Sequence, residues 1–83
     1  MIARIHVTLK KGILDPQGKT VLQSLKNLDI ENVDEVRVGK LIQLRFGDVS
    51  FEDARRKSEE ACQKLLANPV IEDYEVEILN GEG

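Results

Sequence analysis

Few side chains in this sequence are able to do acid–base, nucleophilic or metal chemistry. His6 is the only histidine, the residue type that most often transfers protons near neutral pH, and no nucleophilic side chain is predicted beside it. Cys62 is the only cysteine and falls on the apolar side of a predicted helix, where cysteine usually packs as a small hydrophobic residue. One cysteine and one histidine form neither an internal disulfide nor a zinc site of four protein ligands. We therefore expect no catalytic residue, no bound cofactor and no metal ligand in this chain.

The loop from Lys10 to Gly18 leads into the start of a predicted helix, a common place for a protein to bind phosphate. Pro16 removes one backbone donor there, and Asp15 places a negative charge at the mouth of the loop. The loop has neither the P-loop pattern nor the glycine pattern of dinucleotide-binding proteins. It also lacks the arginine that an acylphosphatase loop would carry. Phosphate binding is therefore disfavoured.

Composition excludes several other classes of protein. Twelve basic and fifteen acidic side chains leave a net charge of −3, which gives no electrostatic footprint for nucleic acid or an anionic membrane. Stacking on RNA bases is not expected either, because the polar sides of two predicted strands carry no aromatic residue; they carry Arg4, His6, Thr8, Gln43 and Arg45. No apolar run is longer than three residues, as at Leu65–Ala67, which is far shorter than the roughly 20 residues of a membrane span. We expect a soluble, cytoplasmic protein that binds neither nucleic acid nor membrane.

Two helices are predicted from their start signals. The first begins at Asp15-Pro16, an N-cap carboxylate followed by proline at the first helical position, and ends near Asp29. The second begins after Ser50 and ends at Asn68-Pro69, because proline cannot continue the hydrogen-bond ladder of a helix. Small or apolar residues fit one face of this second helix: Ala54, Ser58, Ala61, Cys62 and Leu65.

Alternation of apolar and polar residues predicts the strands. The first strand covers Ile2–Lys10 and the last covers residues 74–78. Two short apolar runs between the helices, residues 36–38 and 42–46, flank Gly39-Lys40. We interpret them as a β-hairpin with a three-residue turn or a bulge, since a plain two-residue turn would mismatch the apolar faces.

The predicted element order, β-α-β-β-α-β, is typical of an α+β protein with a ferredoxin-like sandwich. Its antiparallel sheet would have the order 4-1-3-2, with two helices on one face and the other face bare. Glu75 and Glu77 would then lie beside Arg4, His6 and Lys10 on the bare face. We expect one domain, residues 1–79, and a flexible tail at residues 80–83. Such a small domain buries only roughly 63% of its surface alone, which favours association with partners or a second copy.

Three segments carry a family resemblance: Leu9–Gly18, Val36–Lys40 and Leu65–Tyr74. In this order, and in a chain of this length, they look like PurS, the small subunit of phosphoribosylformylglycinamidine (FGAM) synthase. The resemblance implies a role in purine biosynthesis. There a glutaminase subunit releases ammonia from glutamine, and a synthetase subunit uses ATP to convert formylglycinamide ribonucleotide to formylglycinamidine ribonucleotide. It implies that the small subunit bridges these two and assists ammonia transfer without catalytic residues of its own.

The resemblance also implies partners and cofactors. ATP, Mg and glutamine would be used by the partner subunits, with no cofactor bound by this chain, and the chain would form a homodimer or, by doubling again, a tetramer. We expect the contact surfaces on the matching turns, because turns at the ends of a rigid sheet often carry recognition residues. The predicted partner-interface residues are Lys10, Lys11, Asp15, Pro16, Gln17, Gly18, Arg37, Gly39, Lys40, Asn68 and Pro69.

Two alternative functions follow from the residues and the element order. An ACT-like small-molecule-sensing regulatory dimer shares the order of elements, but it normally has a glycine-rich turn where this chain has Asp15-Pro16. A small hydrolase would have to use His6, and the isolated chain would then show turnover that the substitution His6→Ala abolishes.

Overall fold

The structure, a computed structural model, describes residues 1–80 of the 83-residue chain. Of the tail predicted at 80–83, residues 81–83 lie outside the described part. Along the chain come strand β1 (Ile2–Leu9), helix α1 (Pro16–Asn27), strand β2 (Lys40–Arg45), helix α2 (Phe51–Ala61), the short π-helix η1 (Cys62–Leu66) and strand β3 (Glu72–Leu79). The prediction of an α+β protein with an antiparallel sheet and two helices is confirmed.

Within residues 1–80 the sheet has three strands in the order β2-β1-β3, not the four that were predicted, and both neighbours run antiparallel to the central strand β1. Arg4 lies opposite Glu77, and His6 lies opposite Glu75, as the charge pattern predicts. His6, Glu75 and Glu77 are exposed, so the sheet has a polar face that faces solvent. Oppositely charged neighbours of this kind help to fix the register of a sheet.

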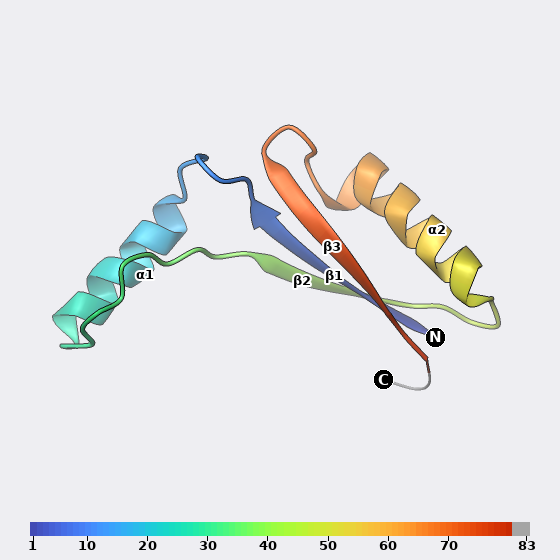
Figure 1. Cartoon of the computed structure of the whole chain (residues 1–83), viewed down its shortest axis with the longest axis horizontal. Helices are drawn as coiled ribbons and strands as arrows, with labels where there is room; N and C mark the ends of the chain where they lie inside the picture. The colour runs from blue at the N-terminus through green and yellow to red at the C-terminus, as the bar shows by residue number, and fades with distance from the viewer. Residues whose placement is uncertain (81–83) are drawn as a thin grey trace.

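The predicted hairpin at Gly39-Lys40 is absent among residues 1–80, and residues 36–38 form no strand of the sheet. Residues 33–39, here called the return segment, instead lead straight into β2 (Figure 1). The reason lies at Gly39, where an added Cβ would come within 2.5 Å of the carbonyl oxygen of Val7. Glycine at position 39 allows two backbone segments to lie close together. Because glycine also favours turns, its presence between two apolar runs fits a hairpin equally well.

Helix α2 covers the other face of the sheet, and the core lies between them. The buried residues Ile5, Val7, Cys62 and Ala67 form its centre. Half-buried apolar side chains from η1 and the flanking strands pack around them: Ile42, Leu44, Leu66, Tyr74 and Val76. Ser50 caps α2 as predicted, because its hydroxyl accepts the backbone N–H of Asp53 at 3.1 Å.

The end of the second helix differs from the prediction. Ala54, Ser58 and Cys62 are buried at intervals of four residues, and then η1 widens the turn, with the N–H of Ala67 donating to the carbonyl of Cys62 at 3.1 Å. A π-turn inserts an extra residue into each turn, so the buried side of the helix shifts along the sequence. Leu65 is 81% exposed, and the prediction that it lies on the buried face is wrong.

Helix α1 projects beyond the end of the sheet instead of lying on it (Figure 1). The predicted position of two helices on one sheet face therefore holds for α2 alone. The Cα radius of gyration is 16.1 Å, against about 12 Å for a compact domain of this length. We call residues 10–39, which leave the sheet after β1 and return to it at β2, the α1 arm. At its tip Asp29 and Asn32 have positive φ angles of 62° and 68°, which turn the chain back after the helix.

Candidate functional site

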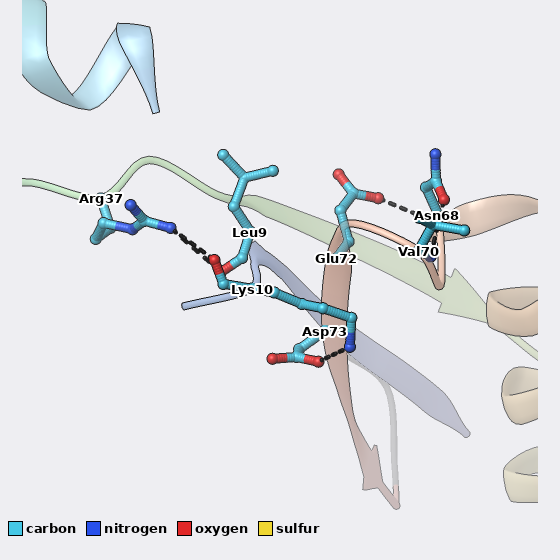
Figure 2. Close-up of polar contacts among 7 residues, drawn as sticks. All are labelled: Leu9, Lys10, Arg37, Asn68, Val70, Glu72 and Asp73. Atoms are coloured by element: carbon cyan, nitrogen blue, oxygen red, sulfur yellow. Dashed lines mark hydrogen bonds and ion pairs between the residues drawn. The ribbon is translucent and has the colours of Figure 1, made fainter. Parts of the chain in front are cut away.

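The predicted partner-interface residues gather at one end of the sheet, where β1 ends and where β2 and β3 begin. Three segments meet there, residues 9–18, 36–40 and 68–73, and we call this region the junction. The N–H of Lys10 donates to the carbonyl of Ile71 at 2.8 Å, and the ammonium of Lys10 lies 2.7 Å from a carboxylate oxygen of Asp73. The close-up in Figure 2 shows this ion pair between the end of β1 and the start of β3.

Asp15 joins two segments of the junction through its two carboxylate oxygens. Oδ1 accepts the N–H of Gly18 at 2.8 Å and so caps α1, as the sequence predicts. Oδ2 accepts the N–H of Val38 at 2.8 Å, which the sequence did not predict. The N–H of Val38, that of Gly18 and the nearby charge of Arg37 hold the pKa of Asp15 below its ordinary value. Asp15 is only 5% exposed, so it shapes the junction from inside.

Gly18 allows α1 to lie directly on the return segment. It is buried, and a Cβ at this position would overlap the carbonyl oxygen of Val36. Pro16 is the first residue of α1, a position whose N–H has no partner within the helix, so the lack of an N–H in proline costs no hydrogen bond. The arm is therefore a helix backed by its own return segment, and the close contact requires glycine.

Arg37 holds the loop that leads out of β1. Its guanidinium donates to the carbonyl oxygens of Ile13 and Lys10, both at 3.1 Å, and to that of Leu9 at 3.5 Å. Figure 2 shows Arg37 reaching from the return segment toward the end of β1. The guanidinium group suits this position because its five N–H donors are held in one plane and spread over several acceptors at once.

Asn68 organises the turn between η1 and β3. Its side-chain oxygen accepts the N–H of Val70 at 3.0 Å, and its carbonyl accepts the N–H groups of Ile71 at 3.1 Å and Glu72 at 2.7 Å. The carboxylate of Glu72 accepts the N–H of Asn68 at 2.7 Å and lies 4.0 Å from the ammonium of Lys40 (Figure 2 shows the contact with Asn68). The turn is thus tied to the start of β2 as well as to its own strand.

The turn also exposes apolar surface. Val70 is 78% exposed at the turn, and Leu65 on the neighbouring η1 is 81% exposed. Glu72, Asp73 and Val70 were not among the predicted site residues. The spacing of four residues between Asn68 and Glu72, at the start of a strand, was the one signal available for the role of Glu72.

The junction separates the predicted residues into two groups. Asp15 and Gly18 are buried, so any contribution from them to an interface acts through the shape of the junction. The other nine are accessible to a partner to some extent: Lys10, Lys11, Pro16, Gln17, Arg37, Gly39, Lys40, Asn68 and Pro69. Asp15 lines two open hollows, of about 440 and 410 Å³. Their walls mix apolar side chains with side chains of both charges.

Outside the junction, His6 lies on the polar sheet face and Cys62 lies in the core. Burial, together with the charge of Glu59, raises the pKa of the Cys62 thiol, so it stays protonated near neutral pH. Among residues 1–80 no three histidine, cysteine or carboxylate side chains are grouped to hold a metal ion. No helix in that same part of the chain is long and apolar enough to cross a membrane.

Comparison with known proteins identifies the family of the chain. Residues 2–80 match the family described as PurS: phosphoribosylformylglycinamidine (FGAM) synthase. The FGAM synthase subunit PurS of Methanocaldococcus jannaschii is 42% identical over 76 residues, which cover 92% of each chain. The Bacillus subtilis subunit PurS is 41% identical over 75 residues, covering 90% of this chain and 88% of that one.

Solved structures show the same likeness in three dimensions. The crystal structure of PurS from M. jannaschii superimposes with a TM-score of 0.87 at 41% identity and covers 98% of both chains. A chain in the structure of PurLQS from Thermotoga maritima superimposes with a TM-score of 0.81 at 32% identity, covering 95% of this chain and 99% of that one. The chain described here therefore belongs to the PurS family of FGAM synthase subunits, in purine biosynthesis.

Proposed function

We propose that this chain is the small, non-catalytic subunit that bridges the glutaminase and synthetase subunits of an FGAM synthase complex in the cytoplasm. In that position it assists the transfer of ammonia from glutamine to the amidine-forming step on formylglycinamide ribonucleotide. The single observation that carries the proposal is the close likeness to a chain of the PurLQS structure from T. maritima, over 95% of this chain.

The shape of the molecule supports a bridging role. Its extents are 49 × 29 × 15 Å, so the tip of the α1 arm and the far end of the sheet are separated along one long axis (Figure 1). A subunit that contacts two partners at once needs two separated surfaces. The junction lies between these ends, and its accessible residues are the predicted partner contacts.

In this proposal the partner subunits, and not this chain, use the cofactors and glutamine. ATP, Mg and glutamine are used by the synthetase and glutaminase subunits, and this chain binds none of them. Ammonia is neutral and small, so it needs shielding from water more than it needs a charged pocket. A rigid subunit that holds the two partner subunits together would keep the path of ammonia between them closed to water.

Self-association is part of the proposal, and the exposed surface supports it. The described chain exposes 6102 Å², whereas a compact protein of 9.3 kDa exposes about 5,000 Å². The excess of about 1,100 Å² per chain is more than the roughly 800 Å² that each partner contributes to a standard interface. A homodimer would bury this excess, and a tetramer is the next symmetric assembly.

The test is reconstitution from purified subunits. The chain is mixed with the synthetase and glutaminase, and amidine formation is compared with glutamine and with ammonia as nitrogen source. We expect omission of this chain to abolish the glutamine-dependent rate and to leave most of the ammonia-dependent rate. Glutamine-dependent activity that persists without the chain would overturn the bridging role.

A double variant tests the junction surface within the same assay. Arg37→Ala with Lys40→Ala removes two exposed cations from the junction. Arg45→Ala with Lys57→Ala removes two exposed cations from outside it and is the matched control. We expect weaker capture of the glutaminase, with glutamine present, by the first variant only. Equal capture by both variants would remove Arg37 and Lys40 from the interface.

A further inference from the structure

We propose that Asp15 and Arg37 form a latch that fixes the direction in which the α1 arm leaves the sheet, and so presents the exposed apolar side chains of the arm to a second copy of the chain. The latch is a property of the single chain. Its consequence for a second copy rests on the homodimer proposed above.

The arm has little else to hold it in place. It joins the sheet through two single connections, one after Leu9 and one before Lys40. Within the described residues, α1 makes at most marginal contact with the sheet and with α2 (Figure 1). Gly12, in the first connection, has a φ of +89°, and a Cβ added there would meet no atom within 4 Å. Without cross-links, two such connections would act as a hinge.

Asp15 and Arg37 cross-link these two connections in opposite directions. Asp15 belongs to the outgoing side and accepts the N–H of Val38 on the return side at 2.8 Å. Arg37 belongs to the return side and donates to three carbonyls of the outgoing side, at Leu9, Lys10 and Ile13. The residues that each link joins are more than 20 positions apart in sequence, so each link connects the chain before α1 to the chain after it. Together the links hold the two connections as one unit.

The latched direction keeps α1 away from the sheet of its own chain. Because the return segment runs straight into β2, the helix that lies on it stays beyond the end of the sheet (Figure 1). Apolar side chains of the arm remain exposed as a result: Leu14 is 61%, Val21 37%, Leu28 69% and Ile30 46% accessible. Of these, Val21 lies in α1, and Leu14, Leu28 and Ile30 flank it. The sheet of the same chain does not bury them, and a second copy would cover them together with the surface excess described above.

Two variants break the latch at different atoms. Asp15→Ser keeps a good N-cap for α1, but its hydroxyl is too short to reach Val38 as well. Arg37→Met keeps the aliphatic stem and removes the donors. Val76→Ala, which removes apolar contacts between β3 and the core, is a control that destabilises the fold without touching the latch.

Hydrogen exchange and sedimentation equilibrium are measured on each full-length protein. We expect exchange of the Val38 amide to accelerate about tenfold or more in Asp15→Ser while the later turns of α1 keep their protection, since a hydrogen bond to a charged group is lost. The homodimer dissociation constant should rise about tenfold in both latch variants and stay within about twofold in Val76→Ala.

The outcomes separate the two claims. Unchanged exchange at Val38 in Asp15→Ser would overturn the latch. Faster exchange with an unchanged dissociation constant would overturn the presentation of α1 to a second copy. A wild-type chain that stays monomeric at millimolar concentration would overturn the homodimer, while the exchange result still decides the latch.

Discussion

The backbone of Gly39 lies so close to that of Val7 that a Cβ at position 39 would be 2.5 Å from the Val7 carbonyl oxygen. Gly39→Ala should therefore destabilise the protein by about 1–3 kcal/mol, because backbone and not a flexible side chain must move. Gly47 is the matched control, since a Cβ added there would meet nothing within 4 Å and its φ is ordinary. Gly47→Ala should be neutral or stabilise by up to about 1 kcal/mol. Urea unfolding measures both, and equal effects would contradict the close approach.

Replacing serine by alanine should change the free energy of unfolding in opposite directions at Ser58 and Ser50. The hydroxyl of Ser58 is fully buried and has no hydrogen-bond partner among the described residues, so Ser58→Ala should stabilise the protein by about 1 kcal/mol. Ser50 caps α2, so Ser50→Ala should destabilise it by about 1 kcal/mol. Thermal unfolding of the two variants gives both signs, and a destabilised Ser58→Ala would show that the hydroxyl is satisfied.

The π-helix predicts different costs at two neighbouring leucines. Leu65 is 81% exposed, whereas Leu66 packs against the core. Leu65→Ala should change the free energy of unfolding by less than about 0.5 kcal/mol, and Leu66→Ala should cost about 2 kcal/mol. Guanidinium unfolding distinguishes them. A larger cost at position 65 would show that Leu65 is buried, as a regular α-helix would predict, and would contradict the π-helix.

Asp15 should make stability depend on pH in the acid range. Hydrogen bonds from Val38 and Gly18, together with the charge of Arg37, lower its pKa in the folded protein below the unfolded value of about 3.9. A carboxyl group with a lowered folded pKa contributes stability above its unfolded pKa and loses it as the pH falls through the folded pKa. The difference in free energy of unfolding between wild type and Asp15→Ser should therefore be constant above about pH 5 and shrink below about pH 4. Urea unfolding at a series of pH values measures it, and a difference that persists at the acid end would show another cause.

The parts of the fold that the sequence predicted are those set by local signals. Caps at Asp15 and Ser50 start the helices, and the alternation around His6 and Glu75 sets the outer strand pairing. The hairpin prediction was wrong because glycine permits both a tight turn and a close backbone approach, and only the position of Val7 in space decides between them. The π-turn was also out of reach, because Leu65 and Leu66 are both apolar, so the sequence pattern does not show which of the two is buried.

The candidate site was partly predictable for a related reason. Turns that follow or precede antiparallel strands meet at one end of a sheet, so Lys10, Arg37 and Asn68 come together whatever their contacts are. The cross-links themselves depend on side-chain reach over long sequence separations. Neither the bond from Val38 to Asp15 nor that from Asn68 to Glu72 leaves a pattern in the residue types beyond their spacing.

The pairing of β1 with β3 places Ile2 directly opposite Leu79, at the end of the sheet away from the junction. The beginning and the end of the strand ladder are thus close enough for a short peptide to join them. A circularly permuted chain could then be opened at the arm tip, near Asp29 and Asn32. In such a chain the helix and its return segment would have no covalent link at the tip. The contacts of Asp15, Gly18 and Arg37 would then help to hold them side by side.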